Sequence, residues 1–366
     1  MRVIIAGNLV NTGYYIAKLL RTKGIDAELL MKKNDLLIND PKTFDNIIEY
    51  PDWVRFWDGT REDWAFRIIK IMRKYDIIHA STELPIFSLF TGKPYLAMAT
   101  GADLYELAHE NSLKGVLLRQ AYKKARVVVF TGTFMNPSIN KLRIRNALFI
   151  PLLWDYTKFS PNRNITNDSE KTIIFHPTNQ DWNDKGNDKF LRAFVRLTKK
   201  FDNVHLILVK RGRDFESSMK LLNNNYSQGK FTILPQTLAQ KDLSEWYNKV
   251  DIVVDQFIVG SIGLIGQEAM ACEKPVINYI DKELHEKWYG EIPPIINAHT
   301  EDEIYYSLLQ SVNDRNMIRK IGAESRKWLL KHHNPDLIIR KYISIYNAIQ
   351  NNAKFQTIED ELSSIH

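Results

Sequence analysis

The sequence predicts an α/β protein in which two open parallel sheets follow one another along the chain. Three observations indicate this fold class. The 366 residues are enough for two domains of about 150 residues each. Short β-branched segments alternate with amphipathic segments of helical period, which is typical of parallel strands covered by helices. This alternation stops at a polar segment, residues 155–171, and then starts again.

The first half opens with a strand, a loop bounded by glycines, a helix and a second strand. We expect the strands at residues 2–6 and 27–31, the loop at Gly7–Gly13 and the helix at 14–23. Together they form a β-α-β unit, the building block of a parallel sheet. The same pattern predicts further strands at 76–80, 94–100, 126–131 and 147–151 and helices at 64–74 and 113–124.

The second half repeats the alternation after the polar segment. Its predicted strands are 172–176, 204–209, 231–234, 251–255 and 275–279, and its helices are 188–200, 215–223, 243–248, 264–272, 301–312, 316–332 and 336–351. We therefore expect one domain at residues 1–155 and a second at 156–339. A C-terminal helix at about 340–366 is expected to cross back to the first domain.

Composition excludes several classes of protein. Hydrophobic residues make up 44% of the chain and charged residues 25%, which is typical of a folded domain and not of a disordered chain. The single cysteine, Cys272, rules out an intramolecular disulfide and a cysteine-based metal site. We see no secretory signal and no apolar run of about 18 residues, so a cytoplasmic location is expected.

The chain is basic, with a formal net charge of +7 that fits an anionic partner. Residues 111–146 hold eight basic residues and no acidic one. Some of these lie at helical spacing beside apolar residues: Arg119, Lys123, Lys124 and Arg126, with Leu117, Leu118 and Tyr122. The stretch predicts either a solvated helix face or reversible docking to an anionic membrane surface, with the protein peripheral on the membrane.

A first candidate site follows the strand at 172–176, because ligands bind to open parallel sheets at the loops that follow the strands. Lys185 and Gly186 come just before a helix that Asp188 can cap. A helix N-terminus presents free N–H groups and partial positive charge, which stabilise a phosphate, and Lys185 adds a full charge. The alternative is an ordinary surface lysine in a turn.

A second candidate site follows the strand at 251–255. Gly260 and Gly263 let the backbone approach a ligand closely, and the helix that begins near Gly263 points its N-terminus at the same place. Glu268 lies on that helix and can accept hydrogen bonds from ribose hydroxyls. The alternative for Glu268 is a solvated helix residue.

Together the two loops resemble the donor half of GT-B glycosyltransferases, most closely family 4-like retaining enzymes. Residues 268–276 read E-A-M-A-C-E-K-P-V, where the family has E-A-M-A-x-G-K-P-V, so Glu273 replaces a glycine. Lys185-Gly186 matches the family's phosphate-binding K-G. Residues 151–161 look like the family's entry to the linker, and 203–212 look like one of its strands.

The resemblance implies two Rossmann-like domains that face each other across a cleft, with the acceptor in the first and the donor in the second. It implies transfer of a sugar, with retention, from a nucleotide-diphosphate donor (a UDP- or GDP-sugar) to a glycan or lipid-linked acceptor. No bound cofactor or metal is expected. The leaving diphosphate is then stabilised by Lys185, and Asp255 and Asp103 are further catalytic candidates.

The resemblance also implies which residues bind the two substrates. The donor-binding residues are Gln180, Lys185, Gly186, Lys210, Gln256, Gly260, Ser261, Gly263, Leu264 and Glu268. The acceptor-binding residues are Gly7, Asn8, Gly13, Thr100, Gly101 and Asp103.

The sequence departs from the family at the donor sugar. Gly260 stands where the E-x7-E motif of the family has its first glutamate, which contacts the transferred sugar. Asp255 or Gln256 is expected to supply that contact instead.

Two further departures concern a cation and a histidine. The arginine that accompanies the K-G lysine in the family is absent, and Gln180 or the turn Lys210-Arg211 has to stand in for it. In the first domain, Thr100-Gly101 occupies the place of a His-Gly pair.

Two other functions stay open. A nucleotide-sugar epimerase has the same architecture and needs acidic residues around the sugar. A basic nucleic-acid-binding protein would use the net charge of +7, but the sequence has no recognition motif for nucleic acid, so we expect no such partner. Hydrolase and P-loop motifs are absent, and the nine histidines lack the spacing of a metal site.

Overall fold

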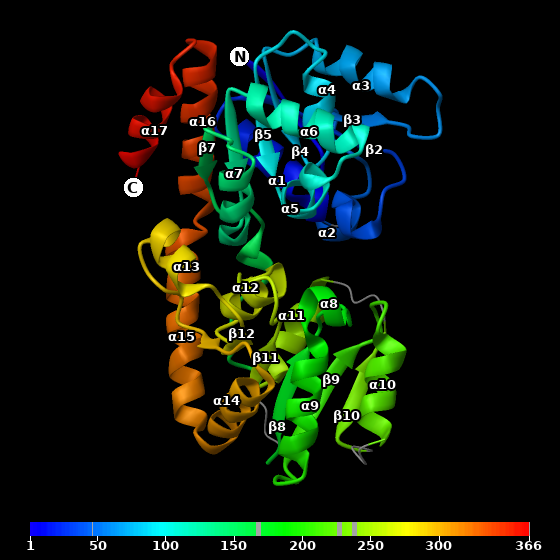
Figure 1. The fold of residues 1–366 in the computed structure, drawn as a ribbon, viewed down its shortest axis with the longest axis vertical. Coiled ribbons are helices and arrows are strands. Elements are labelled where there is room, and N and C mark those ends of the chain that lie inside the picture. Colours follow the sequence, from blue (N-terminus) through cyan, green and yellow to red (C-terminus); the bar gives the residue numbers. More distant parts are fainter. Residues whose placement is uncertain (46, 166–169, 225–228, 236–239, 366) are drawn as a thin grey trace. The chain divides into compact units, whose positions relative to one another are not determined.

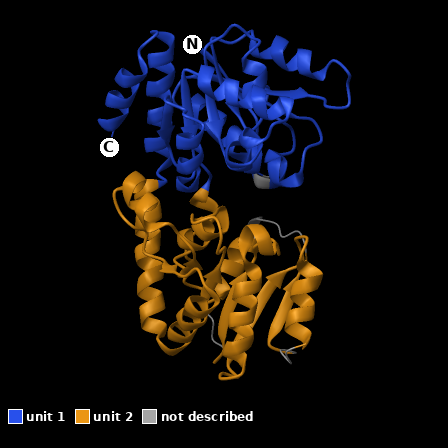
Figure 2. Cartoon of the chain, viewed as in Figure 1, with its two compact units in different colours: residues 1–155, 333–366 blue, residues 156–332 orange. Residues whose placement is uncertain are grey.

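The computed structural model of the chain describes residues 1–45, 47–165, 170–224, 229–235 and 240–365, so part of the polar segment 155–171 lies outside the described residues. The chain forms two compact units, one of residues 1–155 and 333–366 and the other of residues 156–332 (Figures 1 and 2). Each unit contains a parallel sheet surrounded by helices. The predicted α/β fold with two Rossmann-like parallel-sheet domains is therefore confirmed.

The sheet of the first unit has seven parallel strands in the order β3-β2-β1-β4-β5-β6-β7. Their bounds are β1 Arg2–Ala6, β2 Asp26–Lys32, β3 Val54–Trp57, β4 Ile77–Ser81, β5 Tyr95–Ala99, β6 Val127–Phe130 and β7 Ala147–Phe149. The sequence analysis missed β3, because this edge strand is short, contains Arg55 and is only partly buried. It therefore lacks the apolar run that marks the inner strands.

The helices of the first unit are α1 Thr12–Thr22, α2 Pro41–Asp45, α3 Trp64–Met72, α4 Pro85–Ser88, α5 Ala102–Tyr105, α6 Leu113–Lys124, α7 Asn136–Lys141, α16 Pro335–Gln350 and α17 Phe355–Ser363. The predicted helices correspond to α1, α3, α6 and α16. The short helices were not predicted, because four to six residues are too few to show a helical period.

The C-terminal segment joins the first unit at His333, earlier than the expected position near 340. The start of α16 is fixed locally, since the side chain of Asn334 accepts a hydrogen bond from the backbone N–H of Leu337. Its buried face then enters the core that contains Val3 and Ile5 of β1. Tyr346 on this face contacts His79 of β4, with the hydroxyl 2.6 Å from Nδ1.

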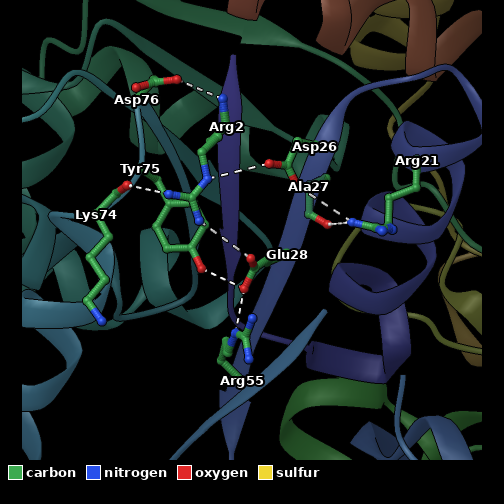
Figure 3. Close-up of polar contacts among 9 residues, drawn as sticks. All are labelled: Arg2, Arg21, Asp26, Ala27, Glu28, Arg55, Lys74, Tyr75 and Asp76. Carbon is green, nitrogen blue, oxygen red and sulfur yellow. Dashed lines mark hydrogen bonds and ion pairs between the residues drawn. The ribbon is translucent and has the colours of Figure 1, made fainter. Parts of the chain in front are cut away.

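A charged cluster ties β1, β2 and β3 together (Figure 3). The carboxylate of Glu28 is buried and accepts hydrogen bonds from Arg55 Nε at 2.5 Å and from the Tyr75 hydroxyl at 2.6 Å. Arg2 forms an ion pair with the same carboxylate at 3.6 Å. Burial alone would raise the pKa of Glu28, but the hydrogen bonds from Arg55 and Tyr75 hold this pKa below its ordinary value.

We expect Glu28→Gln to lower the free energy of unfolding by about 1–2 kcal/mol at neutral pH, a modest value because Arg55 is half-exposed. A lowered carboxyl pKa stabilises the folded state above the unfolded-state pKa, so this difference should shrink as the pH falls below about 4.5. Urea denaturation across pH 3–7 measures it, with exposed Glu62→Gln as the control. Equal stabilities at pH 7, or a difference that persists in acid, would contradict the prediction.

The sheet of the second unit has six parallel strands in the order β10-β9-β8-β11-β12-β13. Their bounds are β8 Thr172–His176, β9 Val204–Val209, β10 Phe231–Leu234, β11 Ile252–Val254, β12 Val276–Asn278 and β13 Ile296–Asn297. The helices are α8 Trp182–Lys185, α9 Asn187–Thr198, α10 Phe215–Asn224, α11 Gln240–Lys249, α12 Leu264–Ala271, α13 Lys282–Tyr289, α14 Glu301–Asn313 and α15 Arg315–His332. Within the described residues, no helix of either unit has the length and hydropathy needed to span a membrane.

Candidate functional site

In the second unit, the two loops singled out from the sequence lie on either side of the point where the strand order reverses. β8 and β11 are neighbours in the sheet, with Ile174 paired to Ile252 and Phe175 paired to Val253. The loop after β8 leads to α8 and α9, and the loop after β11 leads to α12. Ligands of open parallel sheets bind at such a reversal, outside the carboxyl ends of the strands. The fold therefore brings the two loops together at the expected place.

The loop after β8 is fixed by His176, which is fully buried at the end of that strand. Its Nδ1 lies 2.8 Å from the carbonyl oxygen of Val254, and its Nε2 lies 2.8 Å from Nδ2 of Asn187, the first residue of α9. Burial lowers the pKa of His176 to about 4, so the ring is neutral and bridges β8, β11 and α9.

The start of α9 differs from the expectation that Asp188 caps it. Gly186 is the N-cap residue and has φ +69°, a left-handed conformation that favours glycine. Asp188 lies inside the first turn and forms an ion pair with Arg192 at 2.5 Å. The cap prediction is wrong because α8 and α9 meet at Gly186, which places the N-cap two residues before Asp188.

Lys185 is held against the loop that follows β11. Its Nζ donates a hydrogen bond to Oε1 of Gln256 at 2.9 Å, and its carbonyl oxygen accepts one from the backbone N–H of Phe257 at 2.7 Å. A Cβ at Gly186 would lie 3.3 Å from Cβ of Phe257, so glycine permits this close approach. The structure thus joins Lys185, Gly186 and Gln256, and the half-buried ammonium group has a fixed position.

Asp255 is buried beneath the N-terminus of α12. Only 2% of the residue is exposed, and its Oδ1 accepts a hydrogen bond from the Thr178 hydroxyl at 2.8 Å. A Cβ at Gly263 would lie 2.8 Å from its Oδ2, so no side chain fits there. Burial raises the pKa of Asp255, against the lowering effect of Lys185. Asp255 therefore ties the two loops together, and its catalytic role stays a prediction.

The loop between β11 and α12 is folded around the carbonyl oxygen of Ser261. This oxygen accepts hydrogen bonds from Nε2 of Gln256 at 2.9 Å and from Nδ2 of Asn278 at 3.0 Å. Gly260 has φ +69°, and a Cβ there would lie 3.2 Å from Cε1 of Tyr279. Glutamate at position 260 would be strained in this backbone conformation, which explains why the sequence departs from E-x7-E. Gly263 is the N-cap of α12 without a side-chain cap, and its neighbour Leu264 is the first helical residue.

Glu268 lies in the middle of α12 and is 7% exposed, so the solvated-helix alternative is wrong. Its Oε2 accepts a hydrogen bond from the Tyr247 hydroxyl at 2.8 Å. Burial raises the pKa of Glu268 to about 7, although Tyr247 and Arg211 act in the opposite direction. Tyr247 donates its hydrogen bond to Oε2 alone. A carboxyl group with a pKa near 7 and one such contact is suited to accept hydrogen bonds from a ligand.

Arg211 belongs to the Lys210-Arg211 turn that the sequence offered in place of the family's arginine, although only Lys210 was predicted as a donor-binding residue. Its guanidinium lies close enough to Glu268 and Asp255 for their charges to affect its pKa, which burial lowers. It donates a hydrogen bond to the carbonyl oxygen of Pro177, and its Nε has no partner among the described residues. The sequence does contain a signal for Arg211. Lys210-Arg211 directly follows β9, and adjacent residues at the end of a strand point to opposite sides, so if one of the two is exposed the other is directed inward.

Two of the predicted donor-binding residues lie outside the contacts that join Lys185 to Gln256. Gln180 is fully buried, and its side-chain amide is used internally, donating to the Thr178 carbonyl oxygen at 3.2 Å and accepting from the Ser218 hydroxyl at 2.9 Å. Lys210 is exposed at the end of β9. Gln180 therefore supports the loop. Of the alternatives that the sequence offered for the family's arginine, Arg211 is the cation that lies near Glu268 and Asp255.

In the first unit, three of the predicted acceptor residues line one cavity. It measures about 340 Å³ and lies where the chain leaves β1, β4 and β5. Its lining includes Leu9, Thr82, Glu83, Thr100, Gly101, Asp103, Glu106, Glu110 and Lys114. The carboxyl ends of these strands flank the point where this sheet reverses its order, which is the expected place for a ligand.

The other three predicted acceptor residues shape the loop after β1 and do not line that cavity. A Cβ at Gly13 would lie 2.0 Å from the carbonyl oxygen of Gly7, so the loop closes tightly only with glycine. Asn8 is buried, and its side chain accepts a hydrogen bond from the backbone N–H of Tyr14 at 2.7 Å and donates one to the carbonyl oxygen of Asn39 at 2.6 Å. Their role is to position the loop.

Asp103, the second aspartate predicted as catalytic, is hydrogen-bonded within the turn beside the cavity, and its catalytic role stays a prediction. Its Oδ1 accepts hydrogen bonds from the backbone N–H groups of Gly101 at 2.7 Å and Thr100 at 3.1 Å, and its Oδ2 accepts one from the Tyr122 hydroxyl at 2.8 Å. Burial raises the pKa of this carboxyl group, against these hydrogen bonds. Both oxygens are engaged in holding the turn that borders the cavity.

The basic stretch 111–146 buries two of the three apolar residues that we expected on its surface, whereas Leu117 is partly exposed. Leu118 and Tyr122 are fully buried, because α6 turns this face toward the core. Arg119 donates hydrogen bonds to the carbonyl oxygens of Ala108 and Glu110 at 2.8 and 2.7 Å, and Arg126 donates one to Ala353 at 3.1 Å. The exposed basic residues of the stretch are Lys114, Lys123, Lys124, Lys141, Arg143 and Arg145, of which Lys114 pairs with Glu83 at 2.6 Å. Leu113 and Val116 are its exposed large apolar residues.

No group of three or more His, Cys, Asp or Glu side chains in the described part of the chain is arranged to hold a metal ion. The polar groups that the two loops of the second unit assemble are a fixed ammonium, a guanidinium, a helix N-terminus and a carboxyl group with a pKa near neutrality. Such a set can bind a diphosphate and a hydroxylated ring side by side.

Part of the second unit is similar in sequence to a known family. Residues 158–283 match the sequence profile of the family described as Glycosyl transferases group 1. The chain is 23% identical over 306 residues to the uncharacterized glycosyltransferase YqgM of Bacillus subtilis, covering 77% of this chain and 80% of YqgM.

Solved structures share the fold of the whole chain. Alr3699/HepE of Anabaena, in complex with UDP and glucose, is similar with a TM-score of 0.76 and 13% identity over 95% of this chain and 100% of that one. Sucrose-phosphate synthase of Thermosynechococcus elongatus is similar with a TM-score of 0.72 and 16% identity over 96% of this chain and 100% of that one. With the family match, these similarities support a GT-B fold, and the chain is a glycosyltransferase with a glycosyltransferase group 1 domain.

Proposed function

We propose that the protein transfers a sugar, with retention of configuration, from a nucleotide-diphosphate sugar to a hydroxyl of a glycan or lipid-linked acceptor. The observation that carries this proposal is the fixed position of Lys185 Nζ, 2.9 Å from Gln256 Oε1, in the loops at the strand reversal. The N-terminus of α12 begins in the same loop, and Glu268 lies on that helix. UDP is the nucleotide we favour, since Alr3699/HepE was solved with UDP.

The chemistry follows from where charge develops. The bond between C1 of the sugar and the diphosphate oxygen breaks, C1 becomes cation-like, and negative charge accumulates on the leaving diphosphate. Lys185 and the N–H groups that begin α12 are placed to stabilise that charge before the reaction starts, which is the largest contribution such groups make to catalysis. The acceptor hydroxyl then bonds to C1 from the side that the diphosphate leaves, and its proton passes to an oxygen of the leaving diphosphate.

Two side chains bind the nucleotide without taking part in bond breaking. The ionised carboxylate of Glu268 accepts hydrogen bonds from the ribose hydroxyls, while its Oε2 stays bonded to Tyr247. Arg211 is assigned to the diphosphate, as the cation that accompanies Lys185. Gln256, Gly260 and Ser261 form the loop against the transferred sugar. The acceptor is assigned to the cavity of the first unit beside Thr100 and Gly101.

Incubation with UDP-, GDP-, ADP- and dTDP-sugars and a panel of glycan acceptors tests the proposal, with release of the nucleoside diphosphate as the readout. Proton NMR of the product reports the configuration at C1. We expect turnover of one nucleotide class and an unchanged configuration. Formation of an epimer of the donor sugar without an acceptor would identify an epimerase instead, and inversion at C1 would contradict retention.

Docking to an anionic membrane through the basic stretch 111–146 remains a prediction. Because Arg119 and Arg126 are engaged internally, the exposed Lys123, Lys124 and Lys141 carry it. Each contributes about 1 kcal/mol near an anionic surface, so Lys123/Lys124/Lys141→Ser should weaken sedimentation with anionic vesicles by about tenfold or more. Lys199/Lys200→Ser in the second unit is the matched control. Equal binding to neutral vesicles, or no loss in the triple variant, would refute electrostatic docking.

A further inference from the structure

The second unit contains a cavity at the end of the sheet where the strands begin. Lys185 and Glu268 lie at the opposite end, where the strands finish. The cavity measures about 630 Å³, a volume within the range of small-molecule sites. Asp251 and Pro275 line it and directly precede β11 and β12, whereas the candidate donor loops follow β8 and β11. The cavity is therefore separate from the donor site.

Positive charge dominates the lining. The charged side chains are Arg163, Lys274, Arg315 and Arg319, with Asp251 and Glu273. Both carboxylates are already engaged: Glu273 pairs with Arg163 at 2.5 Å, and Asp251 accepts a hydrogen bond from the backbone N–H of Ile173 at 2.8 Å. Arg319 is exposed and has no hydrogen bond or ion pair with any residue that the structure describes. Four cations and two carboxylates leave the lining with a formal charge of +2.

Lys274 is the most deeply placed of these cations. Its Nζ donates to the carbonyl oxygen of Asn248 at 3.0 Å. Burial lowers the pKa of Lys274, which means that its ammonium group is poorly solvated. Asn248 is itself fixed, because its Oδ1 accepts from the backbone N–H of Asn162 at 2.7 Å and its Nδ2 donates to the carbonyl oxygen of Ser160 at 3.0 Å. The part of the cavity wall around Lys274 is therefore held in place before any ligand binds.

Glu273 has φ +58°, a conformation that residues other than glycine seldom adopt. A Cβ at Gly322 would lie 2.1 Å from its carbonyl oxygen, so α15 packs tightly on this turn. Glycine, which the resembling family has at this position, would make the turn without strain. What glutamate adds is the carboxylate that holds Arg163 at the cavity. Strain of this kind is typical of sites where a side chain has to be placed for a ligand.

We infer that this cavity is a binding site for a soluble, phosphate-bearing anion, distinct from the donor site. Guanidinium and ammonium groups bind phosphate through charge-assisted hydrogen bonds, and three separate segments of the unit supply them here. A cavity lined on several sides favours a small molecule over a membrane surface.

Calorimetric titration with inorganic pyrophosphate tests this inference, with UDP present in excess to occupy the donor site. We expect one saturable site whose affinity falls with added salt. Arg319→Gln and Lys274→Gln should each weaken it by about tenfold or more, since each removes a charge-assisted contact. Lys320→Gln, an exposed neighbour on α15 that does not line the cavity, should leave it unchanged.

Two further arms separate this site from its alternatives. Lys185→Ala should bind pyrophosphate with unchanged affinity. If Lys185→Ala loses this affinity and Arg319→Gln keeps it, pyrophosphate binds at the donor site and the inference is overturned. Arg319→Gln should sediment with phosphatidylglycerol vesicles as the unchanged protein does. Vesicle binding that depends on Arg319, in a protein that does not bind pyrophosphate, would identify a lipid headgroup as the ligand and overturn the inference. The absence of saturable pyrophosphate binding would also overturn it. Because Arg319 is exposed, its variant is expected to fold even if Lys274→Gln does not.

Discussion

Replacing Lys185 by alanine is expected to lower kcat/KM for sugar transfer by about 100-fold or more. The ammonium group of Lys185 is held in place by Gln256 before any substrate binds, so it needs no reorganisation when charge develops on the leaving diphosphate. Removing one such preorganised group costs about 10²–10³ in rate. The loss should appear mainly in kcat, because the charge is greater in the transition state than in the bound donor.

The control for this variant is Lys199→Ala, which removes an exposed cation at the other end of α9. It should leave kcat/KM unchanged and therefore exclude an effect of net charge. Thermal melting of both variants shows whether the fold is kept. A folded Lys185→Ala protein with near-normal turnover would contradict the assignment of Lys185 to the diphosphate.

Glu268→Gln is expected to raise the Kd for the donor and for the free nucleoside diphosphate together, by about 10- to 150-fold. A hydrogen bond to a charged group contributes about 1.5–3 kcal/mol, and the contact we propose is to the ribose, which both ligands share. Calorimetry with UDP and with the intact donor measures both values. A variant that loses affinity for the donor but keeps it for UDP would place Glu268 at the sugar instead.

The pH dependence of binding gives this prediction a second readout. With a pKa of about 7, Glu268 is mostly protonated at pH 6 and mostly ionised at pH 8. If the ionised form binds the ribose, UDP should bind about tenfold more weakly at pH 6 than at pH 8. The terminal phosphate of UDP also titrates at about pH 6, and Glu268→Gln isolates that contribution. The same pH dependence in the variant and the unchanged protein would show that Glu268 is not the titrating group.

Most of the fold could be predicted from the sequence, because apolar runs and helical periods are local signals. The elements that were missed are those without such signals. β3 is a partly buried edge strand, and β13 has only two residues. α13 was missed although Asp281 caps it and Gly290 ends it, because its hydrophobic residues are few and it lies between better-marked elements.

The candidate site was predictable only where a residue's place in the chain decides its role. Lys185 and Glu268 follow strands that end at the reversal of the sheet, so their loops had to meet. The function of Asp255, Gln180 and Asp103 depends on burial and on partners far away in the chain, such as Thr178 for Asp255. These contacts have no pattern in one sequence, and for that reason the sequence could not predict that these side chains hold loops together.

Titration of UDP and of GDP into the protein and into the double variant Lys185→Ala/Glu268→Gln tests the central claim most directly, namely that the second unit binds a nucleoside diphosphate through these two residues. We predict saturable binding of one of the two nucleotides at a single site. In the double variant, with an unchanged melting temperature, that binding should become undetectable. Binding of equal affinity in the double variant, or no binding of either nucleotide to the unchanged protein, would contradict the account.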